Sequence, residues 1–286
     1  MRVVQTQTRT RIIRRTGTIE NYYIEDLGNG VELIMLAIPE GHFTMGSPPE
    51  ELERQGDEGP QHEVYFPQGF FMGMYPITQA QWKAVARLDP VNKAYSLNPD
   101  CSNFKGDDLP VENVNWYEAK EFCDRLNTLT KRNYDLPTEA EWEYACRAGT
   151  TTPFYFGETI ATEVVNYHGN NPYGRGSKGE YRGKTTPVGS LRSANAWGLN
   201  DMHGNVWEWC LDHWHSSSYT EKPEECKQDG SIAWLSSDKS KSRLLRGGSW
   251  SLDARYCRSA SRYHDTPGSR RYVVGFRVVC RSSRTR

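Results

Sequence analysis

The sequence predicts a fold of the α+β class in which little of the chain forms regular secondary structure. Three observations lead to this prediction: only three segments carry helix-start signals, the strand-like segments are short, and Gly, Pro, Asn and Tyr are frequent in the remainder. Helices and strands do not alternate along the chain and no internal repeat is found, which argues against a parallel α/β fold. With 286 residues, the chain has room for one large domain or two small ones.

Three short helices are predicted by capping boxes, in which a capping side chain lies three residues before a Glu or Gln that can reach back to it. The pairs are Thr78 with Gln81, Asn115 with Glu118, and Thr138 with Glu141. The third helix is expected to end at Gly149, which suits a C-cap. The second helix carries an apolar stripe at helical spacing, which predicts a face packed on the core. The stripe consists of Ala119, Phe122, Cys123, Leu126 and Leu129.

Strands are predicted for short runs of β-favouring residues at 22–27, 32–38, 63–66 and 276–279. A turn at 28–30 is expected to join the first two runs into a hairpin. The nine tryptophans are expected in the core, because a fold with long loops depends on aromatic packing.

The charge balance excludes several classes of partner. The formal net charge is −1, which gives no electrostatic footprint for nucleic acid or for an anionic membrane. No apolar run approaches the roughly 20 residues that span a bilayer. The N-terminus lacks the apolar core of a secretory signal, so a cytoplasmic protein is expected. The seven cysteines form no CxxC pair, which favours reduced thiols over disulfides or a zinc site.

Six segments together resemble the signatures of the formylglycine-generating enzyme family, also called the sulfatase-modifying factor family, in the family's order. They are FTMGS at 43–47, EGPQH at 58–62, YPITQAQW at 75–82, LPTEAEWEYA at 136–145, MHGNVWEW at 202–209, and RGGSW at 246–250 closing on GFRVVC at 275–280. The resemblance implies the C-type lectin fold of that family in one domain over 31–286. Residues 1–30 are then expected to be an N-terminal extension packed on the domain.

Enzymes of this family oxidise a substrate cysteine with oxygen, using two active-site cysteines that bind copper(I). Aligning the family's Arg-Cys-Ala-Ala-Arg with residues 258–262 puts Ser259 and Ala254 where the two cysteines belong. A two-residue slip along a strand could bring Cys257 to one position, but it could not restore the pair. The resemblance therefore predicts no enzyme activity and no bound copper, with Cys257 as a packed structural residue.

The segment that replaces the catalytic pair has an unusual composition. Residues 251–274 contain no Lys, Glu, Gln, Met or Trp. These five are the amino acids that a codon ending in cytosine cannot encode. The segment resembles the variable region of a diversity-generating retroelement protein, in which adenines of a template repeat, typically in AAC codons, are replaced at random. Several such variable proteins have this type of C-type lectin fold, with the variable region at the C-terminal end.

This resemblance divides the C-terminal segment into fixed and varied positions. The implied fixed frame, called the frame below, is Trp250, Arg255, Cys257, Arg258, Ser259, Ala260, Arg262, Pro267, Arg270, Gly275, Phe276 and Arg277. The implied variable positions, predicted to bind the ligand, are Ser251, Leu252, Asp253, Tyr256, Ser261, Tyr263, His264, Asp265, Thr266, Ser269, Arg271, Tyr272 and Val273. Tyrosines would supply rigid contact area and the small polar residues adaptable hydrogen bonds, as in antibody loops. The alternative is an ordinary solvated loop.

The family resemblance also implies a structural calcium ion. Side-chain oxygens of Asn205 and Glu208 and the backbone carbonyl of Val206 would bind it. The alternative is a glycine turn leading into a buried tryptophan strand, with Glu208 paired to an arginine.

The sequence thus predicts a non-catalytic binding protein whose C-terminal surface is diversified by a retroelement and contacts a protein or other macromolecule. Two alternatives stay open. One is a copper-dependent formylglycine-generating oxidase, and the other is a non-variable docking module of the same fold.

Overall fold

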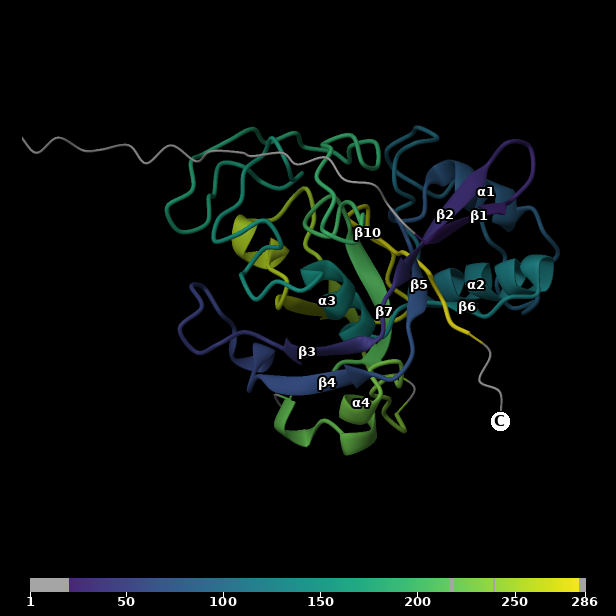
Figure 1. Cartoon of the computed structure of the whole chain (residues 1–286). Coiled ribbons are helices and arrows are strands. Elements are labelled where there is room, and N and C mark those ends of the chain that lie inside the picture. The colour runs from purple at the N-terminus through teal and green to yellow at the C-terminus, as the bar shows by residue number, and fades with distance from the viewer. Residues whose placement is uncertain (1–20, 217–218, 239, 283–286) are drawn as a thin grey trace, which may run out of the picture.

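The computed structural model describes residues 21–216, 219–238 and 240–282, and it contains three small sheets with short helices packed around them (Figure 1). A five-stranded antiparallel sheet has the order β1-β2-β5-β11-β6. Its strands are β1 (Tyr22–Asp26), β2 (Glu32–Ile38), β5 (Phe70–Gly73), β11 (Val279–Cys280) and β6 (Tyr134–Asp135). Residues 1–20 of the expected N-terminal extension lie outside the described residues, while β1 pairs along its length with β2. The domain boundary at residue 31 stays a prediction.

A four-stranded sheet includes short strands from the C-terminal part of the chain. Its order is β10-β7-β8-β9, with β10 and β7 parallel and the other pairs antiparallel. The strands are β10 (Val274–Gly275), β7 (Trp207–His213), β8 (Arg243–Arg246) and β9 (Arg262–Asp265). A separate hairpin joins β3 (Gly41–Met45) to β4 (His62–Phe66). Short 3-10 helices lie at Gly56–Glu58, Tyr219–Glu221 and Ala254–Cys257.

The three predicted helices are confirmed, and each begins with its capping box formed in both directions. They are α1 (Gln79–Ala86), α2 (Trp116–Thr130) and α3 (Glu139–Arg147), and a short α4 (Glu224–Gln228) packs beside β4. Helix α3 ends just before Gly149, as expected, through the left-handed residue Ala148. The apolar stripe of α2 is buried except for Leu129, which is 45% exposed because the last helical turn extends beyond the core.

Two of the strand predictions match β2 and β4, and the predicted hairpin of β1 and β2 is present. The strand predicted at 276–279 is wrong. This part of the chain instead passes from β10 in one sheet to β11 in another, and between them Arg277 turns into the core to meet Glu208. A tertiary ion pair therefore interrupts a segment whose composition favours a strand.

Tryptophans fill the two main core clusters, as predicted. Trp82, Trp142, Trp207 and Trp209 are at most 2% exposed, and Trp116, Trp197 and Trp214 are partly buried against the clusters. All seven cysteines are unpaired, and six of them are buried. In the described parts of the chain, no helix combines the length and the apolar character that crossing a bilayer requires.

Removing one cap should destabilise the fold by a predictable amount. Asn115→Ala deletes the side chain that accepts from the backbone N–H of Glu118 at 2.9 Å, so the free energy of unfolding is expected to fall by about 1 kcal/mol. Urea unfolding measures this change. Thr128→Ala, on the exposed face of the same helix, is the control and should leave stability nearly unchanged; equal effects of the two substitutions would contradict the role of the cap.

Candidate functional site

The C-terminal segment leaves β8 through two glycines and then runs along the surface to β10. Gly247 and Gly248 have φ of +100° and +78°, a region that side chains rarely adopt. A Cβ on Gly248 would lie 2.6 Å from the sulfur of Cys257, so only glycine fits this close approach. The segment then forms the 3-10 helix Ala254–Cys257, the strand β9 and an irregular loop at 266–273.

Buried arginines fasten this segment to distant parts of the chain. Arg258 donates to Glu51 at 2.6 Å and to Glu58 at 2.5 Å, and Arg262 donates to Glu139 at 2.6 Å. All three glutamates lie more than 100 residues earlier in the sequence. Burial opposes ionisation of Glu139, but the charges of Arg262 and Arg246 outweigh it and lower the pKa of Glu139 to about 2. These pairs hold the backbone of the segment in place without a long strand ladder.

Burial separates the predicted variable positions from the predicted frame. Twelve of the thirteen variable positions are exposed or half-buried, whereas ten of the twelve frame residues are buried. The exceptions are informative. Ser261 is fully buried, so its predicted contact with a ligand is corrected: its side chain faces the interior. Arg255 and Arg270 of the frame are exposed, and Arg270 pairs with Glu118 at 2.9 Å.

Three variable rings each lie against a tryptophan outside 251–274. Tyr263 stacks on Trp207 with ring centroids 5.4 Å apart, and His264 stacks on Trp214 at 4.4 Å. The ring of Tyr272 contacts Trp250 at 5.8 Å. Sequence reasoning did not find this arrangement for Trp207 and Trp214, because each is about fifty residues away from its partner in the chain.

The polar variable residues form two hydrogen-bonded groups. In the first, Asp265 pairs with Arg271 and accepts from the hydroxyl of Ser269 at 2.9 Å. Thr266 belongs to the same group, with its hydroxyl 2.7 Å from that of Ser269. In the second, Asp253 accepts from the side-chain amide of Asn171 at 2.6 Å.

The remaining predicted variable positions are half-buried. Leu252, Tyr256 and Val273 pack partly buried against the same core cluster, and the Ser251 hydroxyl lies 3.2 Å from that of Ser249. The predicted positions other than Ser261 are therefore all at least partly exposed.

The two positions where the family's catalytic cysteines belong are fully buried. Ala254 is 1% exposed and Ser259 is 0% exposed. The nearest thiol to the Ser259 hydroxyl is Cys146, at 3.7 Å, and burial raises the pKa of that thiol to about 12. Cys257 is also buried, with its pKa raised by burial to about 12, so both thiols stay protonated at neutral pH.

His203 borders the same buried region, but its ring is held neutral. Its Nδ1 lies 2.6 Å from the carbonyl of Cys257, and its Nε2 accepts from the backbone N–H of Tyr155 at 3.2 Å. Both nitrogens are thus satisfied by one neutral tautomer, and burial lowers the pKa of His203 to about 3. This group has neither the thiolate nor the titrating base that nucleophilic chemistry requires.

The predicted calcium ligands do not fit a calcium ion in this arrangement. Glu208 accepts from Arg277 at 2.6 and 2.8 Å through its two oxygens, and from the indole N–H of Trp142 at 2.8 Å. The side-chain oxygen of Asn205 accepts from Thr186 N–H at 3.0 Å. An arginine already neutralises the carboxylate, which is the alternative that the sequence left open. No group of three or more acidic, His or Cys side chains that could hold a metal is found among the residues with described positions.

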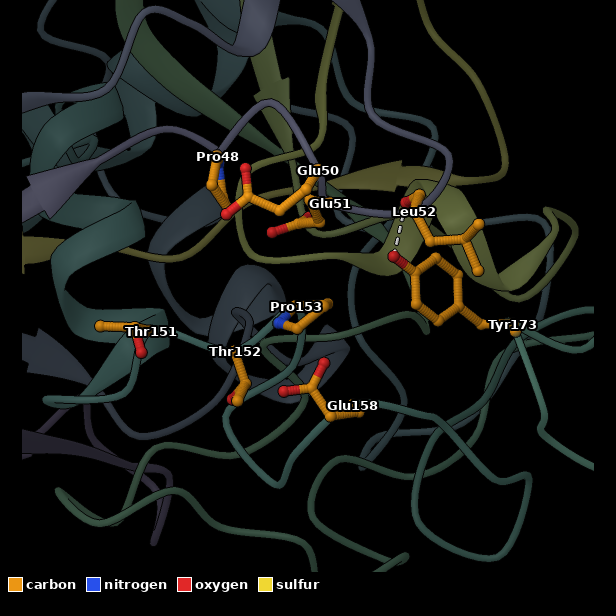
Figure 2. Close-up of a pocket in the computed structure, with 10 residues that line it drawn as sticks. Pro48, Glu50, Glu51, Leu52, Thr151, Thr152, Pro153, Glu158 and Tyr173 are labelled. Atoms are coloured by element: carbon orange, nitrogen blue, oxygen red, sulfur yellow. Dashed lines mark hydrogen bonds between the residues drawn. The ribbon is translucent and has the colours of Figure 1, made fainter. Parts of the chain in front are cut away.

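A pocket of about 340 Å³ lies beside the loop that follows β3 (Figure 2). It is lined by Pro48, Glu50, Glu51, Leu52, Thr151, Thr152, Pro153, Glu158, Tyr173 and Gly174. Glu51 connects it to the frame, since it accepts from Arg258. None of the predicted variable positions lines this pocket.

Comparisons with known proteins agree with this architecture. The family model for the sulfatase-modifying factor enzyme 1-like domain matches residues 31–282. The formylglycine-generating enzyme of Mus musculus is 29% identical, over 86% of this chain and 74% of that protein. The inactive C-alpha-formylglycine-generating enzyme 2 of Bos taurus is 26% identical, over 91% of this chain and 92% of that protein. The solved structure of Treponema denticola variable protein 1 has a TM-score of 0.70 at 26% identity, covering 91% of this chain and 99% of that one.

The fold and these likenesses define the class of protein: an α+β domain with the C-type lectin fold. Within that class, the chain belongs to the formylglycine-generating enzyme family of sulfatase-modifying factors, and it is similar to variable proteins of diversity-generating retroelements. Some of its relatives are described as enzymes and others as inactive. Membership of the family therefore does not decide whether this protein is catalytically active.

Glu208→Gln distinguishes an ion pair from a metal ligand. It leaves Arg277 buried without a counter-charge, so the free energy of unfolding is expected to fall by about 3 to 5 kcal/mol. Urea unfolding should give the same loss in EDTA and in excess calcium. A loss of stability seen only in the presence of calcium would instead assign the carboxylate as a metal ligand. Glu225→Gln, at an exposed position, is the matched control.

Because His203 is buried, the free energy of unfolding is expected to fall as the pH is lowered. Its pKa of about 3 in the folded protein lies below the 6.5 of a free imidazole, so the unfolded chain binds a proton that the folded chain excludes. Stability from this group is complete above pH 6.5 and falls by about 1.4 kcal/mol per pH unit below it.

Urea unfolding at pH 7 and pH 5 tests this linkage. Between pH 7 and pH 5, the free energy of unfolding of His203→Gln should fall by about 2 kcal/mol less than that of the parent protein. This difference is expected whatever the stability of the variant at pH 7. The exposed His42→Gln is the control, and a parent-like loss in the His203 variant would refute the assignment.

Proposed function

We propose that this protein is a non-catalytic binding protein whose exposed C-terminal residues are diversified by a retroelement and contact a protein or other macromolecular ligand. The division of burial within 250–277 is the observation that carries the proposal. Replacement of exposed side chains leaves a folded scaffold intact, whereas replacement of buried ones does not. A segment in which predicted variable and fixed positions follow this division can change its ligand without losing its fold.

The chemistry of the surface supports binding. Tyr263 and Tyr272 are 44% and 51% exposed, and each lies against a tryptophan that restricts its motion. Rigid aromatic side chains lose little entropy on binding and are frequent among residues that dominate interface energies. Asp253, Thr266 and Ser269 add hydrogen-bonding groups around them.

The absence of catalysis is inferred from the buried cluster below this surface. A copper(I) oxidase of this family needs two cysteine ligands, and Ser259 and Ala254 stand at their positions. The neighbouring Cys146 and Cys257 are buried thiols with raised pKa values. Neither has the partly exposed, electropositive setting of a reactive cysteine.

The proposal is tested first in the DNA that flanks the gene. We expect a near-copy of codons 251–274 beside a reverse transcriptase gene, with adenines at the differing positions. The differences should fall on exposed residues and spare the codons of Cys257, Arg258 and Arg262, whose side chains are buried. Sequencing the locus in sister cells measures this, and an identical segment in all cells without a template copy would favour the docking module.

The oxidase alternative has its own test. Purified protein loaded with copper(I) should not oxidise the cysteine of a substrate peptide, as followed by mass spectrometry. Oxidation of the peptide cysteine by the protein with Ser259 in place would overturn the hypothesis that the protein is non-catalytic.

A further inference from the structure

Residues 166–186, called the constant loop below, are fastened directly to the variable segment. The backbone N–H of His168 donates to the carbonyl of Leu252 at 2.9 Å, and the side chain of Asn171 donates to Asp253 at 2.6 Å. The loop is closed on itself by a bond of 2.7 Å from Gly179 N–H to the carbonyl of Gly169. The constant loop lies outside 251–274, so on the proposed function its sequence does not change when the variable segment does.

An exposed ring of the constant loop lies beside an exposed ring of the variable segment. Tyr181 stacks on His168 at 4.0 Å and on Trp250 at 6.1 Å, and Trp250 also contacts Tyr272 at 5.8 Å. Trp250 is 5% exposed, whereas Tyr181 is 42% exposed and Tyr272 is 51% exposed. The two tyrosines therefore present accessible faces around one buried indole, and a ligand that covers Tyr272 reaches Tyr181.

The constant loop also concentrates positive charge. Between residues 171 and 184 it carries Arg175, Lys178, Arg182 and Lys184 against the single acidic residue Glu180, although the whole chain has a net charge of −1. Lys184 is exposed and lies three residues after Tyr181. Arg182 pairs with Glu180, while Arg175, Lys178 and Lys184 are exposed. Exposed basic residues attract partners of opposite charge and raise their rate of association.

We propose that the constant loop is the unvarying half of the ligand-binding surface, with Tyr181 as a contact shared by all variants, and that it favours ligands with an acidic protein surface. This inference rests on the proposed function. Variable residues then select among ligands, while the tyrosine and the basic residues supply affinity common to all of them. Aromatic anchors of this kind account for a large part of the binding energy in protein interfaces.

A displayed library of the full chain tests the inference. The twelve exposed or half-buried variable positions are randomised, and binders are selected in parallel on α-lactalbumin and on lysozyme, two proteins of one fold with opposite net charge. Tyr181→Ala is then placed in each selected binder, and Kd is measured by surface plasmon resonance. Tyr65→Ala is the matched control, because Tyr65 is 43% exposed on β4, at the other end of the molecule from the loops around 166–186 (Figure 1).

Four results decide the matter. Binders obtained mainly on the acidic α-lactalbumin, weakened at least tenfold by Tyr181→Ala and not by Tyr65→Ala, would support the inference. Binders that tolerate Tyr181→Ala would overturn it and leave the proposed function intact. Binders as frequent on lysozyme as on α-lactalbumin would overturn the charge preference. A library without binders on either protein would contradict the proposed function and the inference together.

A second variant tests the inference even if Tyr181→Ala does not fold. Lys184→Glu is exposed, and it should weaken α-lactalbumin binders about fivefold at low salt, with a smaller loss in 0.5 M NaCl because salt screens exposed charges. An affinity unchanged by this charge reversal would also count against the inference.

Discussion

The buried pairing of arginines with glutamates is the interaction on which the C-terminal half of this protein depends. Arg246 pairs with Glu143, Arg262 with Glu139, and Arg277 with Glu208, all almost inaccessible to solvent. An unpaired charge at such depth costs several kcal/mol, so neither partner can change alone. The arginines also donate to backbone carbonyls, as Arg277 does to Asn200 at 3.0 Å, and so hold loops that have no strand partners.

This constraint explains how an irregular segment can be well positioned while the side chains at its predicted variable positions stay at least partly exposed. The guanidinium groups reach inward from the backbone at 258 and 262, while the side chains at 263–266 lie at least partly exposed. Their glutamate partners come from α3 and from the region before α1, both of which lie outside the predicted variable segment. The tryptophans that contact Tyr263 and His264 also lie outside the predicted variable segment, so on the proposed function each ring is positioned by a constant residue.

The helices could be predicted from the sequence because their signals are local. A capping box needs two residues three positions apart, and all three boxes are formed. The strand at 276–279, the calcium ligands and the exposure of Ser261 could not be resolved in this way. Each depends on tertiary contacts: Arg277 donates to Glu208, and the backbone carbonyl of Ser261 accepts from Arg246. The family motifs predicted the fold, and the family model matches residues 31–282, but the motifs do not encode which side chains reach the surface.

The ion pair between Asp265 and Arg271 joins two positions that are expected to vary. Ser269 donates to the same carboxylate, so replacement of one member changes the surroundings of the other two. Energetic effects of contacting residues are not additive. An arginine that is neutralised in this protein becomes a free cation wherever residue 265 loses its charge. On the proposed function, variants of this segment therefore differ as combinations of residues, and the effect of any one residue cannot be transferred from one variant to the next.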